Sequence, residues 1–168
     1  MTSKRMSVFA IVMAVLVICS MALQFVPYFR YDGGSVSLAG YMAFPLENKD
    51  ATAYLVSQNE GFVTNDIVAE FFTPLIGGII LLILLYRYRE NMIVMGLSGA
   101  WGLSGMLIFA LNSSLRLGGG ARIANIAVFT AAAAVSAAYL IARIQSRRHS
   151  DRLAENHKGK EELAAQHS

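Results

Sequence analysis

The sequence predicts an all-α integral membrane protein: a bundle of four transmembrane helices with a small extracytoplasmic β-hairpin sheet and a short helix between the first two spans. Hydrophobic residues make up 55% of its 168 positions, and its mean hydropathy is positive. They are gathered in blocks that are apolar all round, which suits lipid better than a helix with one buried face. Four blocks are long enough to cross about 30 Å of hydrocarbon at 1.5 Å per residue: Ser7–Phe29, Ile67–Tyr86, Met92–Leu111 and Ile123–Ile144.

The distribution of basic residues predicts that both termini are cytoplasmic. With that orientation, ten of the 14 Lys and Arg residues lie inside and four, namely Arg30, Lys49, Arg116 and Arg122, lie outside. This satisfies the positive-inside rule for every segment. Among the inner residues, we expect five to anchor the bundle to lipid headgroups: Arg87, Arg89, Arg143, Arg147 and Arg148.

The first helix is expected over about residues 7–27. Lys4-Arg5, an apolar core and the small residues Ser20 and Ala22 resemble a secretion signal. The apolar run continues to Phe29, however, so we expect an uncleaved helix. Cys19 is the only cysteine, which excludes an intrachain disulfide and a dithiol redox enzyme.

The segment 28–66 is predicted to form a structured outside loop. Asp32-Gly33-Gly34 lies between the β-favouring stretches Phe25–Tyr31 and Ser35–Phe44, which is typical of a hairpin turn. Pro45 ends the second strand, and a short helix follows over Asn48–Gln58. The loop is locally acidic and is interpreted either as a solvated cap over the bundle or as a partner-binding surface.

The second helix, expected over residues 67–86, contains the only ionisable side chain within the hairpin of spans two and three, Glu70. It lies 17 residues before Arg87, roughly 25 Å along the axis, and therefore near the outer interface. We interpret Glu70 as a carboxylate at the helix start that forms an outer-mouth ion pair with Arg122 or Arg30; the alternative is a gate or ion-pathway residue. Pro74 with Gly77 and Gly78 predicts a kink.

The third helix, over residues 92–111, contains a tandem Gly-Leu-Ser-Gly. Its small residues fall at helical spacing and predict close helix packing. They form one stripe of Gly96, Ala100 and Ser104 and a second of Ser98 and Gly102. The Gly-x-Ser-Gly pattern also resembles the nucleophile motif of rhomboid-type intramembrane proteases. Such a serine needs a base, and all three histidines lie in the tail, so we reject a protease.

The fourth helix is expected over residues 123–144, and its alanines give it a slim surface. Residues 1–145 then form the transmembrane domain, and 146–168 form a polar cytoplasmic tail expected to be flexible. The sequon Asn112-Ser113-Ser114 lies flush with the bilayer and is interpreted as a helix end, and Gly118–Gly120 as a turn.

The predicted spans contain no histidine and a single glutamate, Glu70, which excludes di-haem, di-iron and zinc-protease sites, and we expect no cofactor, no metal and no enzyme activity. The net positive charge of +3 is interpreted as favouring contact with anionic lipid headgroups and not with nucleic acid.

In layout, the chain is similar to claudin-like four-helix membrane proteins, which have cytoplasmic termini and a first outside segment with a small sheet. The resemblance is one of topology. The Trp–Gly-Leu-Trp–Cys–Cys signature of that family is absent, and residues 28–66 contain no Cys, so it transfers no functional residue.

Two functions remain open. The first is a non-catalytic accessory or structural subunit that binds another membrane protein or a second copy of itself. The alternative is a minimal oligomeric transporter or channel with Glu70 near its outer mouth. The compact chain suggests a prokaryotic plasma membrane.

Overall fold

The computed structural model shows an antiparallel bundle of four helical spans. Each span is long and apolar enough to cross a membrane. The structure describes residues 3–31, 33–44, 49–58, 64–88, 91–111 and 119–166. Its elements in chain order are α1 (Ser3–Ala22), η1 (Leu23–Phe25), β1 (Pro27–Tyr31), β2 (Gly34–Ser37), α2 (Leu38–Ala43), α3 (Lys49–Gln58), α4 (Thr64–Phe72), η2 (Thr73–Gly77), α5 (Gly78–Tyr88), α6 (Met92–Leu111) and α7 (Gly119–Gln166).

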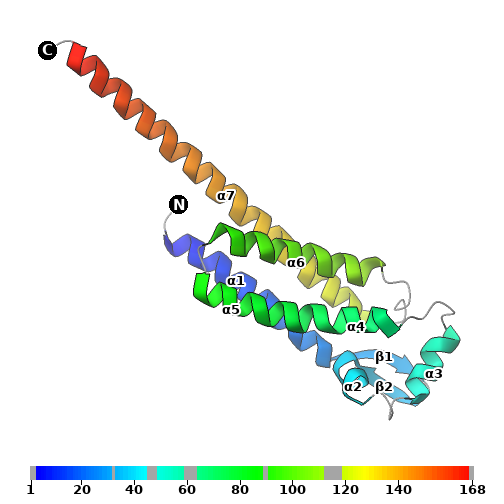
Figure 1. The fold of residues 1–168 in the computed structure, drawn as a ribbon. Coiled ribbons are helices and arrows are strands. Elements are labelled where there is room, and N and C mark those ends of the chain that lie inside the picture. The colour runs from blue at the N-terminus through cyan, green and yellow to red at the C-terminus, as the bar shows by residue number, and fades with distance from the viewer. Residues whose placement is uncertain are drawn as a thin grey trace.

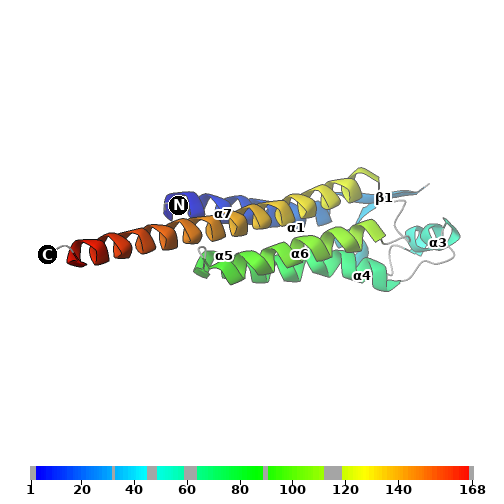
Figure 2. The ribbon, with the colours of Figure 1, turned by 90° about the horizontal axis from the view of Figure 1, so that it is seen from above.

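The helices form a closed ring in which each span contacts its neighbours in sequence. Helix α1 packs on α5 and α7, and α6 packs on the same two helices from the opposite side. We call the two ends of the bundle the sheet end, where β1 and β2 lie, and the tail end, where α7 projects (Figures 1 and 2). The four spans predicted from hydropathy are confirmed, and that of α6 has the expected bounds.

The predicted hairpin is confirmed, but its second strand is much shorter than expected. Strands β1 and β2 pair antiparallel from Pro27↔Ser37 to Tyr31↔Gly34, with a register shift between Pro27 and Phe29. Gly34 has a φ of +143°, a conformation that favours glycine. Asp32 and the predicted strand end at Pro45 lie outside the described residues.

The prediction of a strand over Ser35–Phe44 is wrong beyond Ser37, where the chain turns into helix α2. The Ser37 hydroxyl accepts a hydrogen bond from the Gly40 backbone N–H at 3.0 Å, which satisfies one of the unpaired donors of the first helical turn. Leu38 and Tyr41 then fall on the same side of α2, and both are buried. The Ser37 cap and the three-residue spacing of Leu38 and Tyr41 therefore favour a helix here over the strand that the partly alternating pattern predicted.

Helix α7 continues far past the other helices (Figures 1 and 2). It runs for 48 residues without a break, so the polar tail predicted to be flexible is part of the same helix to Gln166. The last aromatic contact between α7 and α1 joins Tyr139 to Phe9, with ring centroids 5.7 Å apart. We call the projecting residues 146–166 the arm.

Candidate functional site

At the sheet end, a buried carboxylate and a buried tyrosine join the sheet to the bundle. Glu70 on α4 is fully buried, and Tyr28 on β1 is 2% exposed. The Tyr28 hydroxyl donates a 2.8 Å hydrogen bond to Glu70 Oε2. A neutral hydroxyl bonded to a carboxylate oxygen is a strong hydrogen bond, and burial removes the competition from water. Glu70 therefore fixes the sheet on the bundle.

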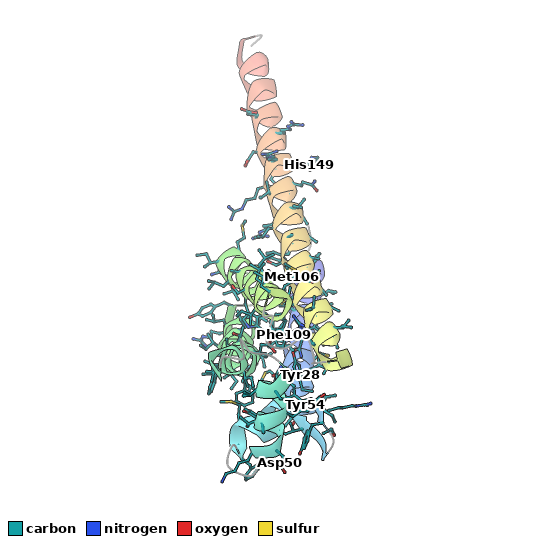
Figure 3. The ribbon with its side chains drawn as sticks, turned by 90° about the vertical axis from the view of Figure 1, so that its right-hand side faces the viewer. Tyr28, Asp50, Tyr54, Met106, Phe109 and His149 are labelled. Atoms are coloured by element: carbon teal, nitrogen blue, oxygen red, sulfur yellow. The ribbon has the colours of Figure 1, made fainter. Side chains whose placement is uncertain are left out.

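Arg122 lies beside the same pair and closes the end of α6. Its Nε donates to the Phe109 carbonyl at 2.8 Å, and one terminal nitrogen donates to the Ala110 carbonyl at 3.3 Å. These carbonyls belong to the last turn of α6, where a helix leaves acceptors unpaired and carries partial negative charge. Arg122 thus joins the start of α7 to the end of α6. Figure 3 shows Phe109 and Tyr28 near the same end of the molecule.

Glu70 and Arg122 act in opposite directions on the pKa of the Tyr28 hydroxyl. Burial raises the pKa of the Tyr28 hydroxyl far above its ordinary value, the negative charge of Glu70 raises it further, and Arg122 lowers it. Tyr28 is therefore a neutral donor at every physiological pH. The structure brings Glu70 and Arg122 into one cluster; an ion pair between them remains a prediction.

Two amide side chains join η1 to α7, and the one on α7, Asn125, lies one helical turn after Arg122. Gln24 and Asn125 are both fully buried. Gln24 Nε2 donates to Asn125 Oδ1 at 3.4 Å and to the Ser20 carbonyl at 3.1 Å, while Asn125 Nδ2 donates to the Ala121 carbonyl at 3.1 Å. Amides that bond across helices hold membrane bundles together because lipid offers them no other partner. We call Gln24, Tyr28, Glu70, Arg122 and Asn125 the polar cluster.

Sequence reasoning identified two members of the polar cluster and missed the other three. Tyr28 falls within the β-favouring stretch Phe25–Tyr31 but was not predicted to be a site residue, and Gln24 and Asn125 were not singled out at all. The available signal was an uncharged amide inside each of two apolar runs, because a buried amide must find a partner. Arg30, the alternative partner for Glu70, is exposed on β1.

The small residues at the closest helix contact are glycines of α6. A Cβ added at Gly102 would lie 2.8 Å from the backbone nitrogen of Ala133 and 2.9 Å from the carbonyl oxygen of Phe129 on α7. Gly105 faces the Phe129 ring, and Gly99 faces the Ser136 side chain. The Ser136 hydroxyl donates to the Met95 carbonyl of α6. These three glycines therefore let the backbones of α6 and α7 approach each other.

The two stripes predicted on α6 differ in position. Of the second stripe, Gly102 lies at the α7 contact, and Ser98 is buried and donates to the Val94 carbonyl at 2.9 Å. In the first stripe, Ala100 and Ser104 are exposed, and a Cβ at Gly96 would meet nothing within 4 Å. The first stripe faces away from the bundle interior, because at 3.6 residues per turn its members lie on the opposite side of α6 from residues 99, 102 and 105.

The predicted kink at Pro74 is a π-helical turn, Thr73–Gly77, that Trp101 supports. Pro74 has no backbone N–H, so the helix cannot continue with regular bonds there. The Trp101 indole N–H donates to the Thr73 carbonyl at 3.0 Å, and a Cβ at Gly77 would lie 2.7 Å from that nitrogen. Gly77 thus makes room for the indole.

Replacing Trp101 with phenylalanine is expected to destabilise the bundle by about 0.5–1.5 kcal/mol, because the Thr73 carbonyl loses its side-chain donor. Ser98→Ala is the matched control: it removes only a bond to a carbonyl within α6 and should cost less. Unfolding in mixed detergent–SDS micelles measures both. Equal losses would contradict the supporting role of Trp101.

Four of the five residues predicted to bind headgroups are described by the structure, and they lie at the tail end. Arg87 is exposed in the last turn of α5, Arg143 is half-buried, and Arg147 and Arg148 are exposed on α7. Arg89 lies outside the described residues. Exposed Tyr86 and Tyr88 flank Arg87. Such amphipathic aromatics are typical of a membrane–water boundary.

Within the described ranges, no three His, Cys, Asp or Glu side chains lie together so that they could hold a metal ion. Comparison of the chain with protein-family models, with curated proteins and with solved structures finds no match. Its four apolar helices indicate an integral membrane protein.

Proposed function

We propose that the chain is a non-catalytic subunit of a membrane assembly that binds another membrane protein or a second copy of itself. The arm is the observation that supports this function. It continues α7 beyond the bundle (Figure 3, where His149 marks it), and residues 147–152 are all exposed. A short polar helix that packs on nothing is marginal in water. A docked partner would supply the missing contacts.

The location of the arm is part of the proposal. Arg147, Arg148 and Arg152 are exposed where α7 leaves the bundle, and basic residues at a span end favour the cytoplasmic side. We therefore place the tail end in the cytoplasm and the sheet end outside, in a claudin-like order of spans, in a prokaryotic plasma membrane.

The alternative function, an oligomeric transporter or channel, requires Glu70 to meet water at an outer mouth. Glu70 is fully buried and bonded to Tyr28, and this burial favours the subunit over the channel. The same carboxylate serves as an attachment point for the sheet, which is a structural role.

A photo-crosslinking amino acid placed at Ser150 in native membranes tests the proposal. The subunit function predicts one protein adduct of defined mass at fixed stoichiometry, and two differently tagged copies of the chain distinguish a foreign partner from a second copy. The lipid-facing position Ile83, 62% exposed, is the control and should give lipid adducts.

A second experiment compares the variant Ser150→Pro with its matched control, Ser150→Ala. Proline breaks the helix of the arm but leaves the bundle untouched. For this comparison the photo-crosslinker is moved to Gln145, which is exposed on α7 directly before the arm. Loss of its protein adduct in Ser150→Pro but not in Ser150→Ala, with unchanged bundle stability, supports docking through the arm. A homo-oligomer that gives no adduct with a foreign protein, together with Glu70-dependent ion flux in liposomes, would overturn the proposal in favour of the channel.

A further inference from the structure

Phe25, Val26 and Phe44 are large apolar side chains that are exposed at the sheet end. Phe25 is 68% exposed, Phe44 is 56% exposed and Val26 is 42% exposed. Phe25 ends η1, and Phe44 directly follows α2. We call these three residues the apolar rim. In water such a group would be unfavourable, and exposed apolar patches mark surfaces that contact a partner or a membrane.

The structure holds the apolar rim in one place. Helix α2 packs against η1, which brings the two phenylalanine-bearing segments together. The Phe44 backbone N–H donates to the Gly40 carbonyl at 3.1 Å and so fixes the end of α2. Leu38 and Tyr41 occupy the buried side of α2. Phe44 is therefore held outside by the packing of the helix that precedes it.

The depth of the apolar rim matches the boundary of the membrane. Phe25 is the last residue of the first apolar span, Val8–Phe25. Helix α2 contacts α4, which carries the start of the second span, Ile67–Tyr88. By contrast, α3 lies farther from the bundle (Figures 1 and 2). The rim thus lies level with the span ends.

We propose that the apolar rim inserts into the boundary between headgroups and acyl chains of the bilayer, so that α2 rests on the membrane surface. Continuity with the lipid-facing surface of α1 identifies lipid as the occupant: Ile11, Val15 and Ile18 are more than half exposed along α1, and Phe25 and Val26 extend this surface. Aromatic rings are favourable at this depth. The inference depends on membrane insertion and not on the subunit function.

Nitroxide spin labels measure the depth directly. In a Cys19→Ser background, a label is placed at Phe44, and Phe25 serves as a second rim position. Val56 on α3, 53% exposed, is the matched control in water, and Ile79 on α5, 49% exposed, is the control within the span. The protein is reconstituted in phosphatidylcholine–phosphatidylglycerol vesicles. Collision rates with oxygen, which enters lipid, and with a water-soluble nickel chelate are then compared.

The inference predicts an oxygen-to-nickel ratio at residues 25 and 44 that is severalfold higher than at 56 and lower than at 79. A ratio at 44 equal to that at 56 would overturn the inference while leaving span insertion intact. Low collision rates with both reagents at 44 would mean that protein covers the rim, which also overturns it. A water-like ratio at 79 would instead contradict membrane insertion itself.

Discussion

Replacing Gly102 with alanine is expected to lower the free energy of unfolding of the bundle by about 1–3 kcal/mol, the range for overpacking a filled interior. The added methyl would meet the backbone of Ala133 and Phe129 at less than 3 Å. Backbone atoms cannot rotate away, so α6 and α7 must separate. Separation also strains the bond between Ser136 and the Met95 carbonyl. The transition in mixed detergent–SDS micelles measures the loss, since helices persist in SDS and only their packing is lost.

Gly96→Ala is the matched control on the same helix. A Cβ there meets nothing within 4 Å, and alanine has the higher helix propensity. The expected change lies within about 0.5 kcal/mol, the usual range for surface substitutions. If Gly96→Ala destabilised the isolated chain as much as Gly102→Ala, this would contradict the structural result that α6 packs on α7 through Gly102 and not through Gly96.

Replacing Glu70 with alanine is the second large effect expected. It leaves the buried Tyr28 hydroxyl without its acceptor and removes the negative charge beside Arg122, which should cost about 1–3 kcal/mol or more. Glu70→Gln keeps an acceptor oxygen and should cost less. Tyr28→Phe should also destabilise by about 1–3 kcal/mol, because the buried Glu70 carboxylate then loses the hydrogen bond from the Tyr28 hydroxyl. Unfolding in micelles measures each variant.

A double-mutant cycle isolates the contact between the sheet and the bundle. The losses from Tyr28→Phe and Glu70→Ala should be smaller together than their sum, since both remove one bond. Tyr86→Phe is the control, because Tyr86 is 91% exposed at the tail end. Additive losses for the pair would show that Tyr28 and Glu70 do not interact.

The spans followed from the sequence because hydrocarbon imposes one simple demand, a long apolar run. The bounds of α6 were predicted to the residue. Local choices between strand and helix were harder to predict. At Ser37 a side-chain cap favours the helix, and the alternation of apolar residues carries no information about that cap. Pro74 predicted a break in the second span. The π-helical form of that break was not predictable, because it involves a hydrogen bond from Trp101, 28 residues away.

The polar cluster was predictable only in part, for a related reason. A charge within an apolar run, such as Glu70, or directly before one, such as Arg122, is conspicuous in the sequence, so both residues were singled out. Gln24 and Asn125 are neutral and 101 residues apart, and only the ring order of the helices brings them together. Likewise, which small residues of α6 meet α7 depends on the rotation of the helix, which hydropathy does not determine.

We expect the four spans to place the sheet end and the tail end on opposite sides of a membrane. Single cysteines at Ser35 on β2 and Ser150 on α7, both exposed, test it in a Cys19→Ser background with a membrane-impermeant maleimide. The account predicts that intact cells label position 35 and that position 150 reacts only after permeabilisation. Equal labelling of both positions in intact cells, or recovery of the chain in solution without detergent, would contradict it.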